Sequence, residues 1–301
     1  MSAMLEFSQV DIVFAPKGKR RAASAVRQAL AALDAGGTRT QIEQQTGVVV
    51  GVANANLAVE RGEICVLMGL SGSGKSTLLR AANGLNPVTR GRVLVGDAQA
   101  TVDIAACDAP TLRRVRRLRI AMVFQQFALL PWRSVRENVA FGLEIRGESS
   151  EQRRRIVDHQ LELVGLTQWA DRYCHELSGG MQQRVGLARA LATDADILLM
   201  DEPFSALDPL IRRKLQDELC SLQSKLHKTI LFVSHDLDEA LRLGDRIAIL
   251  EGGCIVQIGT PQQIVHQPAD AYVAEFVRHV NRQTALKGAP ASLAADPGGP
   301  D

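Results

Sequence analysis

The sequence predicts an α/β fold with a central parallel sheet. Five short apolar runs are continuous rather than alternating, as expected of parallel strands that are covered on both faces. Helical patterns lie between them, as in Ser76–Ala82 and Gln182–Ala192, so strands and helices alternate along the chain. A length of 301 residues, 46% of them hydrophobic and 23% charged, is ample for a buried core. The predicted strands are Ile64–Met68, Ile120–Phe124, Ile197–Met200, Ile230–Val233 and Ile247–Leu250.

One long interval departs from this alternation. From Gln126 to Glu176 the chain contains helical patterns such as Gln152–Val164 and no strong strand. A segment of this kind between two strands of one sheet indicates an inserted helical unit. We therefore expect a helical subdomain over about residues 126–180.

Two further segments lie outside the predicted sheet. Residues 17–46 form an insert that is basic at first and then helical over Ala25–Leu33 and Thr40–Gln45. Residues 284–301 hold two clusters of glycine and proline and little apolar bulk, so we expect them to be disordered. One domain is thus predicted over residues 1–283, followed by a tail.

Composition excludes several classes of function. The net charge of +2 indicates no particular partner, and only 4% aromatic residues argue against a stacking platform for nucleic acid. No apolar stretch approaches the ~20 residues that span a bilayer, and the first residues do not resemble a signal peptide. No C-x-x-C occurs, so free thiols in a reducing cytosol are expected rather than a zinc or redox site. The cysteines are Cys65, Cys107, Cys174, Cys220 and Cys254.

A glycine-rich loop between a predicted strand and a predicted helix carries the clearest chemistry. Its glycines let backbone N–H groups surround phosphate oxygens, and the helix that follows adds its positive end. In such a loop Lys75 neutralises the β and γ phosphates of a nucleotide, and the Ser76 hydroxyl binds Mg²⁺. The loop and the residue after it are Gly69, Leu70, Ser71, Gly72, Ser73, Gly74, Lys75, Ser76 and Thr77.

Two adjacent carboxylates end the strand that begins at Ile197. Asp201 and Glu202 lie where the carboxyl ends of parallel strands form a ligand-binding crevice. Successive residues of a strand point to opposite sides, so the two acids can have different tasks. We expect Asp201 to hold Mg²⁺, directly or through water, and Glu202 to polarise the attacking water as general base.

A second anion-binding helix end is predicted at Ser178, Gly179 and Gly180. A serine and two glycines before the helical pattern can cap the helix and expose backbone N–H groups. An ordinary helix cap would have the same pattern, and a single phosphate loop needs no second site of this kind. The motif is therefore informative only together with the others.

The order of these motifs resembles the nucleotide-binding subunit of ABC transporters. The phosphate loop is followed by LSGGMQQR from Leu177, ILLMDE from Ile197, SALD from Ser205 and SHD from Ser234, and the likeness covers roughly residues 10–282. The resemblance implies a P-loop NTPase fold with a parallel core sheet, an antiparallel β part and an inserted helical subdomain. It also implies ATP and Mg²⁺ as ligands and ATP hydrolysis by a homodimer.

The resemblance also assigns roles to single residues. Ser178, Gly179 and Gly180, with Gln182 after them, are expected to contact the nucleotide bound to the opposite subunit. His235 is expected to contact the γ-phosphate of its own nucleotide, and Gln125 to sense Mg²⁺ and the attacking water. Asp208 is expected to cross the dimer interface. These subunits usually stack an aromatic ring on adenine, and Phe14 is the candidate here. The 17–46 insert separates Phe14 from the phosphate loop in sequence. That Phe14 is an ordinary core phenylalanine is therefore an equal alternative.

Within this family the pattern is similar to importers of quaternary amines. The segments VERGE from Val59, MGLS from Met68, FALLP from Phe127 and DLDEA from Asp236 are typical of subunits for choline, glycine betaine and proline. Glycine betaine members commonly carry paired CBS domains after the ATPase, for which this chain leaves no room. They also tend to have His where Trp132 stands and Ala where Pro203 stands. The pattern is closest to bacterial choline importers, with glycine betaine or proline as the alternative.

The resemblance finally implies partners and a location. We expect separate transmembrane permease subunits, indirectly a substrate-binding protein, no nucleic acid, and a peripheral position on the cytoplasmic face of the inner membrane. A soluble, non-transport ABC ATPase is the alternative of another class, but the coiled-coil arms or fused second half of such proteins are not encoded. The arginines between Arg113 and Arg119 are interpreted as a solvated helix face rather than as a lipid or nucleic-acid site.

Overall fold

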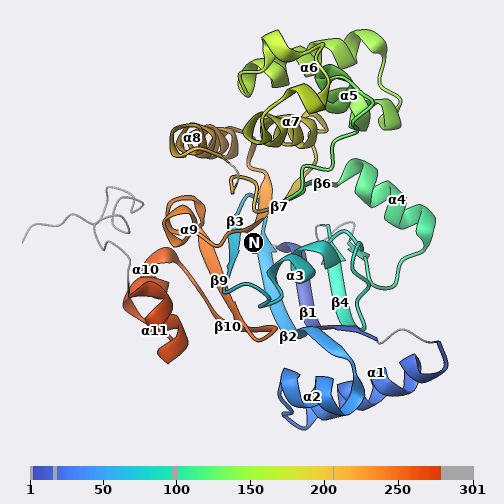
Figure 1. The fold of residues 1–301 in the computed structure, drawn as a ribbon, viewed down its shortest axis with the longest axis vertical. Helices are drawn as coiled ribbons and strands as arrows, with labels where there is room; N and C mark the ends of the chain where they lie inside the picture. Colours follow the sequence, from blue (N-terminus) through green and yellow to red (C-terminus); the bar gives the residue numbers. More distant parts are fainter. Residues whose placement is uncertain (1–2, 16–18, 97–100, 206, 279–301) are drawn as a thin grey trace, which may run out of the picture.

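Two β-sheets stacked around one helix form the centre of the molecule (Figure 1). The computed structural model describes residues 3–15, 19–96, 101–205 and 207–278. The larger sheet has six strands in the order β10-β9-β3-β8-β7-β6, parallel except for the β10–β9 pair. Its strands are β3 (Ile64–Met68), β6 (Ile120–Val123), β7 (Ile197–Asp201), β8 (Thr229–Val233), β9 (Arg246–Glu251) and β10 (Cys254–Gly259).

The smaller sheet is antiparallel and has the order β2-β1-β4-β5. Its strands are β1 (Ala3–Phe14), β2 (Val49–Glu60), β4 (Arg90–Val95) and β5 (Val102–Asp103). The sequence resemblance implied an antiparallel part without locating its strands. β1 and β2 are mostly buried, whereas β4 is half-exposed and β5 has only two residues. The predicted fold class is confirmed.

The predicted parallel strands match the observed ones to within one residue at each end. All five residues of β3, β7 and β8 are buried, which is why these strands are apolar except for Asp201 at the end of β7 and Thr229 at the start of β8. One core lies between the two sheets around α3 (Lys75–Ala81), and the other lies on the opposite face of the parallel sheet, around Phe204 and Phe232. That second face is covered by α7 (Gly179–Ala192), α8 (Pro209–Leu226) and α9 (Leu237–Leu243).

A separate helical layer lies at one end of the long axis (Figure 1). It contains α5 (Val135–Arg146), α6 (Ser150–Leu163) and two short 3₁₀ turns at Thr167–Trp169 and Cys174–Glu176. From Gln126 to Glu176 the structure assigns helices and turns and no strand, only an isolated bridge. Its apolar cluster continues into α7 through Val185 and Ala188. The boundaries of a subdomain at about 126–180 stay a prediction.

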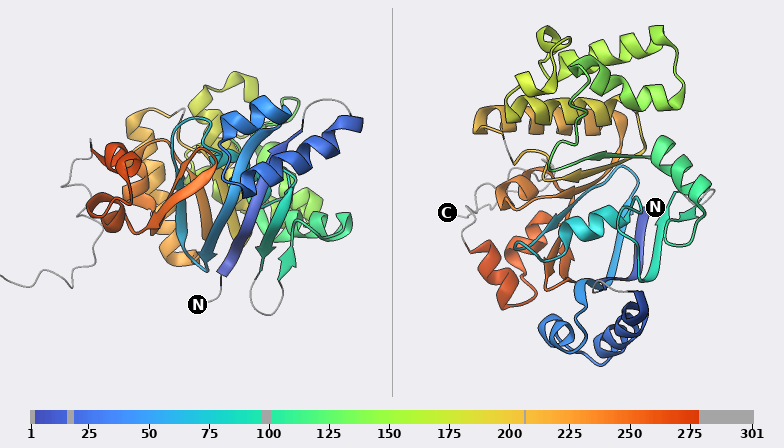
Figure 2. Two further views of the ribbon diagram at one scale, coloured as in Figure 1. Left: turned by 90° about the horizontal axis from the view of Figure 1, so that it is seen from below. Right: turned by 45° about the vertical axis from the view of Figure 1, so that its right-hand side comes forward.

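Residues 19–46 of the predicted insert lie at the other end of the long axis (Figure 1). They form α1 (Lys19–Asp34) and α2 (Arg39–Thr46), each longer than its predicted helix. Remaining helices are α4 (Ala109–Leu118), α10 (Pro261–His266) and α11 (Ala271–Val277). Figure 2 shows α10 and α11 on the side of the molecule away from α4 and β4. The predicted disordered tail, 284–301, lies outside the described residues.

Candidate functional site

The glycine-rich loop connects the end of β3 to the start of α3, as the sequence predicts. Gly69 and Gly74 have φ angles of 140° and 102°, which side chains rarely tolerate. A Cβ atom on Gly69 would lie 2.1 Å from the Leu250 carbonyl oxygen, and one on Gly74 would lie 2.4 Å from that of Gly51. Backbone from two other strands therefore presses the loop into its curled shape, and only glycine fits there.

Lys75 is the cation of this loop. Its side chain is 6% exposed, and Nζ donates to the carbonyl oxygens of Gly69 at 2.8 Å and Leu70 at 2.9 Å. Burial lowers the pKa of Lys75, while the carboxylates of Glu202 and Asp201 oppose that shift. The ammonium group is thus held inside the loop, where it can neutralise phosphate charge.

Asp201 is fully buried at the end of β7. Its Oδ1 accepts a hydrogen bond from Ser76 Oγ at 2.7 Å, and its Oδ2 accepts from Arg80 Nη2 at 2.8 Å. Arg80, on α3, was not predicted from the sequence. It supplies the counter-charge that a buried carboxylate requires. The hydroxyl and carboxylate oxygens of Ser76 and Asp201 are the ligand type that Mg²⁺ prefers, so these residues fit that ion.

Glu202 is held in a left-handed backbone conformation with φ of 48°, which is costly for a residue with a side chain. Its N–H donates to the Val233 carbonyl at 3.1 Å, and its carbonyl accepts from Gln183 Nε2 at 3.3 Å. These bonds, to β8 and to α7, fix the turn after the strand. The unusual backbone aims the carboxylate away from buried Asp201.

The side chains of two other predicted residues meet at one carboxylate oxygen of Glu202. Oε2 accepts a hydrogen bond from Gln125 Nε2 at 3.3 Å and lies 3.3 Å from His235 Nδ1. Gln125 follows β6 and His235 follows β8, so the carboxyl ends of neighbouring parallel strands bring the three side chains together. An acid, an amide and an imidazole around one point are suited to orienting a water molecule and moving its proton.

These groups surround an open cavity of about 690 Å³. Phe14 lies on its wall and is 40% exposed, so it is not a core phenylalanine. Phe14 pairs with Val49 across β1 and β2, so the insert between them loops out without moving the ring away from the phosphate loop. The lining residues are Phe14, Arg39, Val49, Gly51, Ser71, Gly72, Gly74, Lys75, Ser76, Thr77, Gln125, Glu202 and His235.

Three of the lining residues were missed by sequence reasoning: Arg39, Val49 and Gly51. All three come from the insert or from the strand after it. Thr38 and Gln41 form a capping box that marks the start of α2 in the sequence, but no sequence signal places that helix beside the phosphate loop.

Nine of the predicted site residues do not line the cavity. Gly69, Leu70 and Ser73 belong to the phosphate loop itself, and Asp201 is buried beside Ser76. The other five lie at the starts of α7 and α8. Ser178 caps α7 by accepting from the Met181 N–H, and Asp208 caps α8 by accepting from the Ile211 N–H. A Cβ atom on Gly179 would meet nothing within 4 Å. Gln182 donates to the carbonyls of Cys174 and Leu177, which braces the loop before Ser178. Ser178, Gly179 and Asp208 are exposed, and Gly180 and Gln182 are half-buried. These residues lie at the starts of α7 and α8, outside the cavity.

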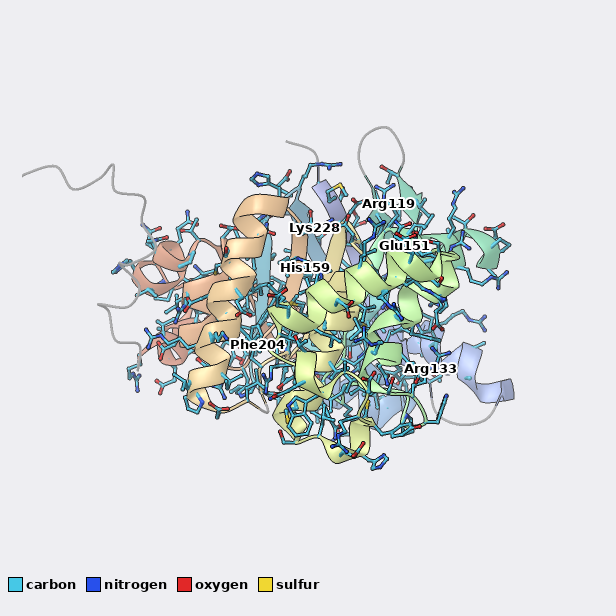
Figure 3. All side chains as sticks on the ribbon, turned by 90° about the horizontal axis from the view of Figure 1, so that it is seen from above. Arg119, Arg133, Glu151, His159, Phe204 and Lys228 are labelled. Atoms are coloured by element: carbon cyan, nitrogen blue, oxygen red, sulfur yellow. The ribbon has the colours of Figure 1, made fainter. Side chains whose placement is uncertain are left out.

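A second cavity, mostly apolar and about 270 Å³, lies where α6 and α7 meet α8. His159 and Lys228 line it and are seen together in Figure 3. None of the predicted site residues lines this cavity. In the described part of the chain no group of three or more His, Cys, Asp or Glu side chains could hold a metal, the five cysteines are free, and no helix is long and apolar enough to cross a membrane.

Known proteins resemble this chain in sequence and in fold. The family model described as ABC transporter matches residues 52–205. A solved structure of the ATP-binding cassette MJ0796, described as a dimeric post-hydrolysis state bound to ADP and phosphate, superposes with a TM-score of 0.71 at 30% identity. That match covers 85% of this chain and 98% of the cassette.

Curated relatives are more similar in sequence. The glycine betaine/proline betaine transport ATP-binding protein ProV of Escherichia coli is 55% identical over 83% of this chain, and GbuA of Listeria monocytogenes, for glycine betaine/carnitine, is 50% identical over 83%. TmoW of Ruegeria pomeroyi, for trimethylamine N-oxide, is 52% identical over 78% of this chain and 68% of its own length. The chain spans 61% of ProV and 62% of GbuA. By motif order, fold and sequence, the chain belongs to the ABC transporter family, among its ATP-binding proteins.

Proposed function

We propose that this protein binds and hydrolyses ATP to power an importer of quaternary amines. The observation that carries the proposal is the meeting of Gln125 and His235 at the Glu202 carboxylate, beside a loop that buries Lys75. This arrangement places a base, a water-orienting amide and a phosphate-neutralising cation on one cavity. A merely regulatory nucleotide-binding protein would not need the base.

Each residue of the cavity has a task in this scheme. The loop N–H groups and Lys75 hold the β and γ phosphates, and Phe14 stacks on adenine. Ser76 and Asp201, with Gln125, hold Mg²⁺, which neutralises the charge of the phosphates when bound. Glu202 takes the proton of the attacking water, and His235 orients the γ-phosphate.

The exposed Ser178 surface supports a homodimer. Ser178, Gly179 and Gly180 lie outside the cavity of their own subunit, so they can complete the site only in a second copy of the chain. Two head-to-tail copies would place each Ser178 helix end against the other copy's nucleotide. Asp208, at the start of α8, would lie in the same interface.

The curated relatives and two sequence positions bear on which quaternary amine is transported. The curated relatives act on glycine betaine, proline betaine, carnitine and trimethylamine N-oxide, all small solutes that carry a quaternary or oxidised amine. Trp132 and Pro203, which depart from the glycine betaine pattern, favour choline. The chain itself would act from the membrane surface through separate permease subunits, with a binding protein selecting the solute.

Uptake of labelled choline into vesicles that contain this chain, its permease and its binding protein tests the proposal. We expect uptake only with ATP inside, and stronger competition by unlabelled choline than by glycine betaine. Lys75→Ala should abolish this uptake, and it serves as the control that uptake depends on ATP binding by this chain. Stronger competition by glycine betaine would reject choline as the substrate, but the chain would still belong to an importer of quaternary amines. Uptake that does not need ATP hydrolysis would reject the proposed ATPase function.

A further inference from the structure

The insert is firmly fixed to the antiparallel sheet. Ile42 of α2 is completely buried, in a cluster with Val13, Val48 and Val50 from the ends of β1 and β2. At the end of α1, Asp34 pairs with Arg90 of β4, which also pairs with Asp11 of β1. A hairpin held by an apolar cluster and by this bridge presents its residues in a fixed place.

Arg39 is the residue that this hairpin places at the nucleotide cavity. It is the first residue of α2, directly after the Thr38 cap, and its side chain is half-buried. Its Nη1 donates to the carbonyl oxygen of Gly72, in the middle of the phosphate loop, at 3.0 Å. It also lines the same cavity as Phe14 and Lys75. Arg39 therefore links the insert to the phosphate loop.

The guanidinium group retains donors beyond that single bond. Arginine carries five N–H donors in a rigid plane, and Gly72 takes one of them. Among the described residues no carboxylate lies within ion-pair distance of Arg39, unlike Arg80 and Arg90, which both pair with aspartates. An arginine without an acidic partner, anchored beside a phosphate-binding loop, has the geometry and charge to bind a phosphate group.

We propose that Arg39 is a nucleotide-binding residue, whose guanidinium group contacts the polyphosphate of the bound nucleotide while it holds Gly72. The proposal rests on a nucleotide occupying this cavity, as in the proposed function. It follows that the insert contributes to the nucleotide site, and that bound polyphosphate and the α1–α2 hairpin stabilise each other through Arg39.

Nucleotide affinity of single variants of the full chain tests this assignment. Arg39→Ala should weaken ATP binding about tenfold, because a charge-assisted hydrogen bond is lost. ADP binding should weaken by a similar or smaller factor, and AMP binding by about twofold or less, because the contact is to the polyphosphate. Arg39→Lys should fall between Arg39→Ala and the wild type, since lysine keeps the charge but cannot bond Gly72 and phosphate as a planar fork.

Two controls separate the possible outcomes. Arg27→Ala removes an exposed arginine from α1 of the same insert and should leave all affinities unchanged. Lys75→Ala should weaken ATP binding strongly, and an unchanged affinity there would overturn the proposed function itself. If Lys75→Ala weakens binding while Arg39→Ala binds ATP within twofold of the wild type, the Arg39 assignment alone fails.

The nucleotide series overturns the proposal in a second way. Equal losses for ATP, ADP and AMP in Arg39→Ala would mean that Arg39 acts on the base or on the shape of the loop, not on polyphosphate. Raising the salt concentration gives an independent readout, since loss of a phosphate contact should make ATP binding less sensitive to salt. An unchanged salt dependence in Arg39→Ala would contradict the assignment.

Discussion

Glu202 shows how one backbone conformation separates two adjacent acids. Asp201 is the last residue of β7, and its buried carboxylate pairs with Ser76 and Arg80. The left-handed turn at Glu202 sends the next carboxylate to the cavity, where Gln125 and His235 lie. One acid is thus suited to an ion and the other to a water molecule, although they are neighbours in sequence.

Glu202→Gln should therefore keep ATP binding and lose turnover. The amide replaces the base without altering the phosphate loop, so we expect hydrolysis to fall by about 10²–10⁴-fold. Steady-state phosphate release and the affinity of a fluorescent ATP analogue measure the two properties. Asp238→Asn, an acid on α9 outside the cavity, is the matched control. Near-normal turnover of Glu202→Gln would remove Glu202 from the role of base.

The start of α9 is tied to the loop that carries His235 through a buried carboxylate. Glu239 is 8% exposed, and its Oε1 accepts from Gln216 Nε2 of α8 at 2.9 Å. Its Oε2 accepts from the Ser234 hydroxyl, one residue before His235. Asp236 and Arg212 are the charged groups nearby, and burial raises the pKa of Glu239 against the effect of both hydrogen bonds.

A raised carboxyl pKa gives a definite sign for the pH dependence of stability. The folded chain keeps the Glu239 proton above the ordinary pKa of 4.5, where the unfolded chain has released it. This contribution is fully present below that value and is lost as pH rises through the folded pKa. Denaturant titrations from about pH 5 to about pH 8 should show a shallower decline in the unfolding free energy for Glu239→Gln.

The matched control for that measurement is Glu43→Gln, an exposed glutamate on α2. Its pH profile should follow the wild type. Where the folded chain holds one proton that the unfolded chain has released, the unfolding free energy falls by about 1.4 kcal/mol per pH unit. This is the largest difference in slope expected between the wild type and Glu239→Gln. A Glu239→Gln profile parallel to that of the wild type would show that Glu239 is ionised in the folded chain throughout this range.

The two ends of the long axis contribute to the site in different ways. The insert reaches the cavity of its own chain through Arg39, and the helical end presents Ser178 on a surface outside that cavity. In the proposed homodimer, a second chain would supply the Ser178 helix end that completes the site.

Mixed dimers test directly whether each nucleotide site is formed by residues of two subunits. Placing Lys75→Ala and Ser178→Arg in one subunit, opposite a wild-type partner, damages both shared sites, so ATPase activity should vanish. Placing one change in each subunit puts both lesions in one site, and the intact site should retain up to about half of the activity if the sites act independently. Both dimers carry the same substitutions, which controls for stability. Clear activity in the first dimer would show that the sites are not shared.

Local patterns were enough to predict the parallel strands and the position of the phosphate loop between β3 and α3. The buried runs of β3, β7 and β8 are apolar because both faces are covered, and the phosphate loop needs glycine at fixed spacings. Gln125 and His235 were expected from the resemblance to ABC transporter subunits, and the structure brings both to Glu202 because each of the three residues follows a strand of one parallel sheet. The strand and loop signals lie within a few residues of the feature they predict.

Contacts between distant segments were decided only by the tertiary structure. The pairing of Phe14 with Val49 closes the insert into a loop and leaves the ring at the cavity, which the number of residues between Phe14 and the phosphate loop did not suggest. Arg39 meets Gly72, and Arg80 meets Asp201, across 33 and 121 residues of chain. The residues next to an arginine in the sequence do not show whether its side chain lies in solvent or bonds a carbonyl or carboxylate oxygen. Its role therefore depends on which acceptor groups the fold brings near it. The sequence by itself determined the parallel strands, the phosphate loop and the order of the motifs, because these depend on neighbours along the chain. The antiparallel sheet and the walls of the cavity depend on neighbours in space.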